Sequence, residues 1–463
     1  MKTETLFINP FYRQFDGPIT DNRLPPLELI NCATMLKQQG RLVRVVDAHI
    51  QQWGAADLAR RDLDIDPGLV VMGTSPLNTW QCPPKTIEPF FTAARAMKKK
   101  FPQALVIGCG PGTCFFLREM LSVCDLVIAG QPEPFFQAVG NPGDKAVLFA
   151  APGAVFLEPS GEMTRVDPVR RADMTAWPCP DYKLLDYRQY RFGVMRDWVV
   201  ELETSRGCPQ LCDFCFQAMT HYQYSHKTVR QVIAEMRYVA AELGGRDIFF
   251  ADLDMGADQN FLKELLPAMA AEQFPLRWSA NFRSGCLNSE LLPQLRRAGC
   301  QVALIGVESA DEQFQQAMGK NASLAQLRQR IALAQKHGLE VAGYFMIGLP
   351  AEDESRINAT VRLAQDLNLD YASFQIQTSY PDPARPGQCK ETGGLPQVSA
   401  ERLAELQSLA YQKFYLRPGY ILKKFPLLAN PRNLWSHLRV FAQTFQRKTI
   451  AVQRGISDAA QTK

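Results

Sequence analysis

Short runs of apolar residues alternate with helical patterns through the first third of the chain. The apolar runs are rich in β-branched residues and end near Gly or Pro, as in the stretch 68–75 (GLVVMGTS). Between them apolar positions recur at helical spacing, as in 25–40, which starts with Pro and stops at Gly. Continuous apolar strands that alternate with helices are typical of a parallel sheet covered on both faces. We therefore predict an α/β fold with a doubly wound, Rossmann-like domain over 1–140, whose ligands lie beyond the carboxyl ends of the strands.

A second series of the same kind begins at residue 198, after a segment of different character. Residues 141–197 are rich in Pro and Gly and show no clear helical or strand period. We therefore expect a linker, held in an ordered conformation by its aromatic residues. Six strand-like runs follow, separated by helical patterns, at 198–207, 247–254, 277–285, 302–309, 341–350 and 371–378. Six such units predict a partial (β/α)6 barrel over 198–395, with its site in the loops at the strand ends. The remaining segment, 396–463, is predicted to be mostly helical.

Composition narrows the class of protein. The chain has 463 residues, of which 46% are hydrophobic and 21% charged, so it can bury more than one core. Its 51 basic and 47 acidic residues nearly cancel, so charge gives no indication of a nucleic-acid partner. The first ten residues lack the apolar run of a signal peptide, and no apolar stretch reaches the ~18 residues of a membrane helix. Because 12 cysteines in such a chain indicate a reducing compartment, we expect a cytoplasmic protein with free thiols.

Three cysteines stand close together directly after the first strand of the second series. Cys208, Cys212 and Cys215 form the pattern C-x3-C-x2-C within 205–217 (SRGCPQLCDFCFQ). Three thiolates from one loop can hold three irons of a cubic [4Fe-4S] cluster, which leaves the fourth iron open to a small-molecule ligand. A zinc site is the alternative, but structural zinc usually takes two C-x2-C or C/H elements, and no second half stands out. The spacing therefore favours the iron–sulfur cluster.

This segment resembles the signature of the radical S-adenosylmethionine (SAM) superfamily, with Phe214 as its aromatic residue. The resemblance implies a [4Fe-4S] cluster on the three cysteines, with SAM on the open iron. It also implies that the reduced cluster cleaves SAM to methionine and a 5′-deoxyadenosyl radical, with an electron donor such as a flavodoxin or ferredoxin. Phe214 would lie near the adenine of SAM, and the Gly-Leu-Pro turn at Gly348 would let backbone approach it.

Three further strand ends resemble the positions that bind SAM in that superfamily. Asp252 and Asp254 are candidates for its amino group, and which of them acts stays open because relatives often have adjacent acids here. Arg283 is the candidate for its carboxylate, with an external salt bridge as the alternative. Glu308 and Ser309 follow the fourth strand and are candidates for its ribose or methionine, since a buried carboxylate without a partner is costly.

A doubly wound domain ahead of such a barrel resembles the cobalamin-dependent, B12-binding branch of the superfamily. The resemblance implies that a corrin rests on the loops after the third, fourth and fifth strands. Its expected contacts are Thr74, Ser75, Gly108, Gly110, Gly130 and Glu133. The alternative is a domain that supports the barrel without a cofactor.

The segment 47–52, with Asp47 and His49, resembles the start of the D-x-H-x-x-G motif that supplies a histidine ligand to cobalt in other B12 proteins. Here they follow the second strand rather than the first, and Gln52 stands where the motif has Gly. We therefore expect no histidine ligand to cobalt.

With both cofactors, the resemblance implies methylation of an unactivated carbon of a small-molecule or lipid-like biosynthetic intermediate. Radical cyclisation, ring contraction or another rearrangement without methyl transfer is the first alternative, and a non-catalytic iron–sulfur or corrinoid protein is the second. The basic and apolar stretch 420–448 is expected to pack as a helix over the barrel mouth. Peripheral contact with a membrane surface is the alternative for that stretch.

Overall fold

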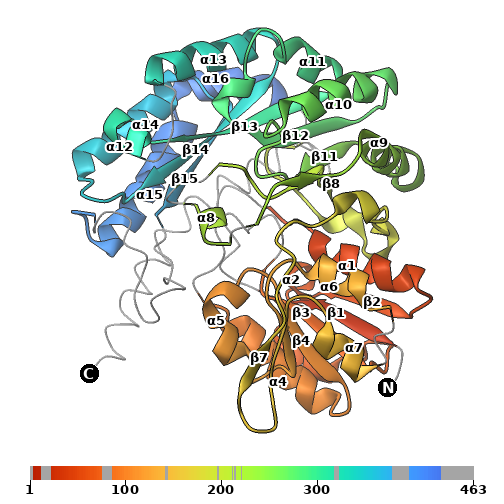
Figure 1. Ribbon diagram of the computed structural model, residues 1–463. Coiled ribbons are helices and arrows are strands. Elements are labelled where there is room, and N and C mark those ends of the chain that lie inside the picture. Colours follow the sequence, from red (N-terminus) through yellow and green to blue (C-terminus); the bar gives the residue numbers. More distant parts are fainter. Residues whose placement is uncertain are drawn as a thin grey trace.

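The computed structural model describes ten segments of the chain: 4–11, 22–75, 86–140, 144–195, 198–210, 212, 215–220, 222–317, 323–377 and 396–428. Within them, two large sheets follow one another in sequence. Figure 1 shows these sheets as two halves, an N-terminal half in red to yellow and a barrel half in green to blue.

The N-terminal half is built on a seven-stranded sheet in the order β2-β1-β3-β4-β5-β6-β7. Five parallel strands form its main part: β1 Thr5–Asn9, β2 Val43–Asp47, β3 Leu69–Gly73, β4 Leu105–Cys109 and β5 Leu126–Ile128. The antiparallel strands β6 Ala154–Leu157 and β7 Met163–Arg165 continue the sheet beyond β5. These two strands come from the segment in which the sequence indicated only a linker, so the sheet extends past residue 140.

Helices cover both faces of this sheet, which explains why its strands are continuous apolar runs. The helices of the half are α1 Leu27–Gln38, α2 Ala48–Gln51, α3 Ala55–Arg60, α4 Glu88–Lys100, α5 Thr113–Met120, α6 Pro132–Ala138 and α7 Lys145–Ala150. One core lies under α1, α6 and α7, and a second core lies under α3, α4 and α5. The predicted doubly wound architecture is confirmed.

The barrel half is built on six parallel strands in the order β15-β14-β13-β12-β11-β8. The strands are β8 Val199–Leu202, β11 Asp247–Phe250, β12 Arg277–Phe282, β13 Cys300–Glu308, β14 Glu340–Ile347 and β15 Tyr371–Ile376. The helices are α9 Val229–Tyr238, α10 Gln259–Ala271, α11 Leu292–Arg297, α12 Glu312–Ala317, α13 Leu324–Lys336, α14 Glu354–Asp366, α15 Ala400–Tyr415 and α16 Pro418–Leu428. Figure 1 shows the helices outside a curved sheet, so the predicted partial barrel is confirmed.

A small ribbon and a short helix lie where the two halves meet. β9 Ser205–Arg206 pairs antiparallel with β10 Ser225–His226, and α8 Gln217–Thr220 lies between them in sequence. Figure 1 shows α8 between the barrel half and the N-terminal half. The three cysteines of the sequence motif belong to the loop that leads into α8.

Aromatic residues pack the segment that connects the halves. Tyr182, Tyr187 and Tyr190 form successive ring contacts at 5.5 Å. The hydroxyl of Tyr190 donates to Asp47 Oδ2 at 2.8 Å, and the amide of Asp181 donates to Thr34 Oγ1 at 2.8 Å. These contacts fasten the connecting segment to β2 and α1 of the N-terminal half.

Two tyrosines of α15 close the outer edge of the barrel at β15. Tyr411 Oη accepts from the amide of Phe374 at 3.1 Å and donates to its carbonyl at 3.2 Å. Tyr415 Oη does the same for Ala372, at 3.0 and 2.9 Å. The hydroxyls thus satisfy edge groups that would otherwise be open to another strand.

The described part of the chain contains no helix with the length and apolar character needed to cross a membrane. Of the stretch 420–448, only the residues up to 428 are described, and they belong to α16. The expected packing of the stretch over the barrel mouth stays a prediction.

Candidate functional site

The predicted cluster ligands lie in the loop 207–216, which we call the cluster loop. Cys208, Cys212 and Cys215 are all partly buried, and the amide of Cys215 donates to the carbonyl of Cys212 at 2.9 Å in a tight turn. Burial raises the pKa of Cys208 to about 11 and that of Cys215 to about 12, and the charge of Cys212 adds to both shifts. Because the thiols are close enough to repel one another as thiolates, a bound metal centre is what would stabilise their charged forms.

The arrangement of these thiols bears on which metal centre they fit. In the described segments, no three His, Cys, Asp or Glu side chains converge as the ligands of one metal ion would. Zinc needs such convergence, whereas in a cubic cluster each thiolate binds a different iron. The preference for iron–sulfur over zinc thus rests on the cysteine spacing and stays a prediction. Phe214 lies outside the described residues, so its place beside an adenine stays a prediction.

The two acidic candidates after β11 have different surroundings. Asp252 is wholly buried and accepts hydrogen bonds from the amide and hydroxyl of Thr204, at 2.9 and 2.6 Å, and from the hydroxyl of Ser205 at 2.5 Å. Its carboxylate is thus occupied in fastening the end of β8 to the end of β11. Among the described residues, Asp254 accepts backbone amides alone, both through Oδ1, from Gly256 at 3.1 Å and Arg283 at 3.3 Å. The structure therefore favours Asp254 over Asp252 as the residue available to a ligand.

Asp254 and Arg283 lie within electrostatic range of the first cysteine of the cluster loop. The charge of Asp254 raises the pKa of Cys208 and the charge of Arg283 lowers it, after the larger effect of burial. Arg283 is only partly buried, so its guanidinium is accessible. An acid and a base beside one thiol form a pair that suits the ammonium and carboxylate of an amino acid.

Glu308 lies beside the last cysteine of the cluster loop. Its backbone φ is +67°, a left-handed conformation that residues other than glycine seldom adopt. The register between β13 and β14 shifts immediately before it. Its charge adds to the raised pKa of Cys215, whose largest cause is burial. Strained backbone at a strand end beside predicted metal ligands is typical of a functional position.

Two other SAM candidates have structural partners. Ser309 is buried, its hydroxyl lies 3.5 Å from Thr360 Oγ1, and it accepts from the amide of Asp311 at 3.1 Å. Gly348 has φ +76°, and a Cβ atom there would lie 2.9 Å from Leu403 of α15. Helix packing and the turn are sufficient to explain that glycine. The expected SAM contacts of both residues stay predictions.

In the N-terminal half, the loops after β3 and β4 interlock through Thr74. The amide of Thr74 donates to the carbonyl of Cys109 at 2.9 Å, and the amide of Gly112 donates to Thr74 Oγ1 at 2.9 Å. Gly110 has φ +99°, and a Cβ atom on it would lie 2.6 Å from Thr74 Oγ1. Gly110 is thus required by its conformation and by the close approach of the two loops.

We expect Gly110→Ala to lower the melting temperature and to disrupt the loops expected to hold a corrin. The alanine would combine the strain of a left-handed backbone, ~1–2 kcal/mol, with a clash against Thr74. Gly40→Ala is the matched control, because Gly40 has φ +77° and a Cβ there would meet nothing within 4 Å. Thermal unfolding and corrinoid retention would be measured for both variants. Equal shifts in the two would show that the clash is unimportant.

Two buried polar side chains at the same edge of the sheet have unsatisfied atoms. Ser75 follows β3, and its hydroxyl has no hydrogen-bond partner among the described residues. Gln131 follows β5, and within the same part of the chain neither its amide nitrogen nor its amide oxygen has one. Because buried polar atoms without a partner are costly, they point to a bound polar ligand or water at this edge. The sequence analysis missed Gln131, although it stands directly between the candidates Gly130 and Glu133.

Three other corrin candidates have protein neighbours. A Cβ atom on Gly108 would lie 2.6 Å from Met120 and 3.0 Å from Phe90, so this glycine lets α4 and α5 pack on β4. A Cβ atom on Gly130 would lie 3.1 Å from Pro168. Glu133 is wholly buried and forms an ion pair with Arg206, Oε2 to Nη1, at 2.6 Å. These placements give each residue a packing or pairing role, and a corrin contact for them stays a prediction.

Asp47, the first residue of the incomplete D-x-H-x-x-G stretch, has structural partners. Its carboxylate caps α2, and it accepts from Asn9 Nδ2 at 2.8 Å and from Tyr190 Oη at 2.8 Å. These bonds tie β2 to β1 and to the connecting segment.

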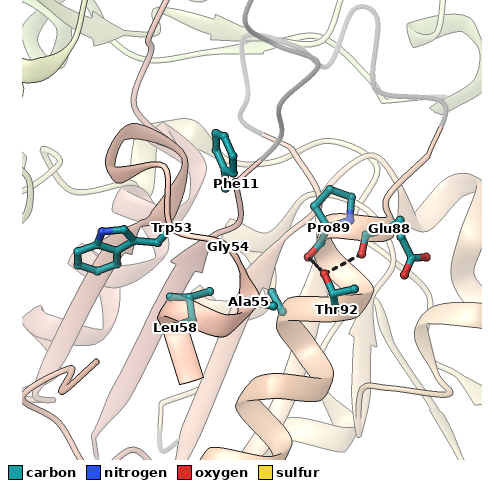
Figure 2. A pocket seen from close by; sticks show the side chains of 9 residues that line it. Phe11, Trp53, Gly54, Ala55, Leu58, Glu88, Pro89 and Thr92 are labelled. Carbon is teal, nitrogen blue, oxygen red and sulfur yellow. Dashed lines mark hydrogen bonds between the residues drawn. The ribbon is translucent and has the colours of Figure 1, made fainter. Parts of the chain in front are cut away.

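An open pocket of about 270 Å³ lies over α3 and α4 in the N-terminal half (Figure 2). Its lining is mostly apolar and includes Phe11, Trp53, Leu58 and Pro89. The hydroxyl of Thr92 donates within α4, to the carbonyls of Glu88 and Pro89 at 3.1 Å each. The pocket therefore offers apolar surface rather than catalytic groups.

Comparison with known proteins agrees with this arrangement. The model of the Radical SAM superfamily matches residues 202–364. The chain is 24% identical to an uncharacterised methyltransferase of Pyrococcus horikoshii, over 86% of this chain and 89% of that protein. It is 22% identical to the anaerobic magnesium-protoporphyrin IX monomethyl ester cyclase of Rubrivivax gelatinosus, over 81% of this chain and 68% of that protein.

A solved structure shares the fold of both halves. It is that of the radical SAM methyltransferase TsrM from Kitasatospora setae, with cobalamin and a [4Fe-4S] cluster bound. The TM-score is 0.63 at 18% identity, with 81% of this chain and 75% of that chain covered. At this identity the likeness shows the fold.

Proposed function

We propose that the chain is a cobalamin-dependent radical SAM enzyme that methylates an unactivated carbon of a small-molecule or lipid-like biosynthetic intermediate. The observation that carries the proposal is the meeting of two sites. The cluster loop of the barrel half contacts α5 of the N-terminal half through Phe216 and Phe115, and α5 follows β4, the strand between those that precede Ser75 and Gln131. Methyl transfer from a corrinoid to a substrate radical needs its reactants at one place.

The residues present fit the two cofactors. Cys208, Cys212 and Cys215 would hold a [4Fe-4S] cluster, and Ser75 and Gln131 would contact a corrinoid. When bound, the reduced cluster supplies the electron that cleaves SAM to a 5′-deoxyadenosyl radical, and methylcobalamin supplies the methyl group. We propose that the corrinoid domain extends past residue 140 to include β6 and β7, because these strands complete its sheet.

The chain itself binds and orients the reactants. Asp254 would accept hydrogen bonds from the SAM ammonium, and Arg283 would donate to its carboxylate. Glu308, whose backbone is strained at the end of β13, would contact the ribose or methionine.

A rearrangement without methyl transfer is the second candidate function. The relative from Rubrivivax gelatinosus, which is named a cyclase, favours it. The fold is shared by both kinds of enzyme, so the reaction must be separated by its products.

The test uses partial reactions that need no known substrate. Anaerobically reconstituted protein with cobalamin, a reductant and SAM carrying a deuterated methyl group should form labelled methylcobalamin and S-adenosylhomocysteine. It should also form 5′-deoxyadenosine by slow cleavage of SAM. Formation of 5′-deoxyadenosine with no labelled methylcobalamin would favour rearrangement. Formation of neither product would favour a non-catalytic carrier.

A further inference from the structure

Arg206 stands two residues before the first cysteine, and its side chain reaches out of the barrel half. Its guanidinium forms an ion pair with Glu133 of α6 at 2.6 Å and bonds with Glu203, which follows β8, at 2.7 to 2.9 Å. All three side chains are at most 5% exposed. The cluster loop is therefore tied to the N-terminal half by a charged side chain at its beginning.

Asn31 of α1 closes these contacts into a ring. Its amide nitrogen donates to Glu203 Oε1 at 2.9 Å and to Glu133 Oε1 at 3.2 Å. We call Asn31, Glu133, Glu203 and Arg206 the interdomain ring. It joins two elements of the N-terminal half to two positions of the barrel half. The indole of Trp177, in the connecting segment, lies 4.8 Å from the guanidinium of Arg206.

The end of the cluster loop is tied to the N-terminal half by an apolar contact. Phe216 follows Cys215 directly and is wholly buried, and its ring lies 5.3 Å from that of Phe115 in α5. α5 begins at Thr113, just after the loop in which Gly110 meets Thr74. The three cysteines thus lie between two fixed points, a polar one and an apolar one.

We propose that the interdomain ring and the Phe115–Phe216 contact fix the cluster at a set distance from the corrinoid. This inference rests on the proposed function. Arg206 and Phe216 are positioning residues, since they act through the loop that carries the metal ligands. The planar guanidinium matters for this role, because it bonds two carboxylates in fixed directions, which a lysine ammonium does not.

Breaking the interdomain ring is also expected to lower the stability of the fold. A buried charged group that loses its partner keeps its desolvation penalty, so removing one member destabilises the others. Arg206→Lys keeps the positive charge but removes the planar, two-sided guanidinium. It therefore tests the geometry of the interdomain ring more directly than Arg206→Gln, which also removes the charge. Arg277→Lys is the matched control, because Arg277 pairs with Asp247 at 2.6 Å at the first residues of β12 and β11, the opposite ends of those strands from the predicted site.

The experiment measures the separation of the two cofactors by pulsed electron paramagnetic resonance. The reduced cluster and cob(II)alamin each carry an unpaired electron, so their dipolar coupling reports their distance. Wild type and Arg277→Lys should give the same narrow distribution. Arg206→Lys should shift or broaden it while iron and cobalamin contents stay at the wild-type level. Phe216→Leu should do so too, and it serves where Arg206→Lys fails to fold.

The outcomes separate this inference from the proposed function. An unchanged distribution in Arg206→Lys or Phe216→Leu protein that holds both cofactors would overturn the positioning role alone. A wild-type protein that binds a cluster but no cobalamin would overturn the proposed function and the inference with it.

Discussion

Alanine at Cys208, Cys212 or Cys215 is expected to abolish SAM cleavage. Each cysteine would supply one of only three protein ligands to a cubic cluster, so losing one leaves two irons without a thiolate. Bound iron should fall from about four per chain to near zero, and 5′-deoxyadenosine should fall below detection. The measurements are iron and sulfide content, the ~400 nm absorbance of the reconstituted protein, and product chromatography.

Cys179→Ala is the matched control for this loss. Cys179 is exposed in the connecting segment, and its thiol makes only a weak contact, at 3.8 Å, with the carbonyl of Pro180. It should keep full iron and full SAM cleavage. An alanine variant of Cys208, Cys212 or Cys215 that retains iron and still cleaves SAM would rule out this cluster assignment.

The features that the sequence predicted correctly are local ones. The strands of both halves are mostly continuous apolar runs with turn residues at their ends. Such runs can be recognised in the sequence without any knowledge of contacts. The cysteine motif is also local, since its three members stand within one loop, and its assignment to a cluster stays a prediction. The surroundings of Asp254, Arg283 and Glu308 agree with the strand-end rule for such folds, because parallel strands bring their carboxyl ends to one edge.

The features that the sequence did not reveal depend on contacts between distant residues. Glu133 and Gly108 look like ligand contacts because they stand at strand ends, yet Glu133 faces Arg206 and Gly108 faces two helices. β6 and β7 are short and only partly buried, so their pattern resembles a linker. The exposed or buried state of an amide such as Gln131 leaves no trace in a single sequence.

The choice between Asp252 and Asp254 is of the same long-range kind, and asparagine substitutions test it. Asp252 accepts the amide of Thr204 on Oδ2 and two hydroxyls on Oδ1, so an asparagine keeps the backbone bond only if both hydroxyls turn from donors into acceptors. Asp254 accepts both of its backbone donors on Oδ1, so an asparagine in the same orientation keeps them. We therefore expect Asp252→Asn to destabilise the fold by about 1–3 kcal/mol, because bonds to a charged carboxylate are replaced by weaker ones with both hydroxyls reversed.

Asp254→Asn should fold as wild type and bind SAM about tenfold more weakly, since about 1.4 kcal/mol of charge-assisted bonding to the ammonium would be lost. Chemical denaturation and equilibrium dialysis of SAM on the reconstituted protein would measure the two effects. The reverse pattern, with a folded Asp252→Asn that no longer binds SAM and an Asp254→Asn that binds it normally, would make Asp252 the ligand. The assignment thus depends on which carboxylate the surrounding backbone and hydroxyl groups leave available, because both aspartates stand at the same strand end and both are buried.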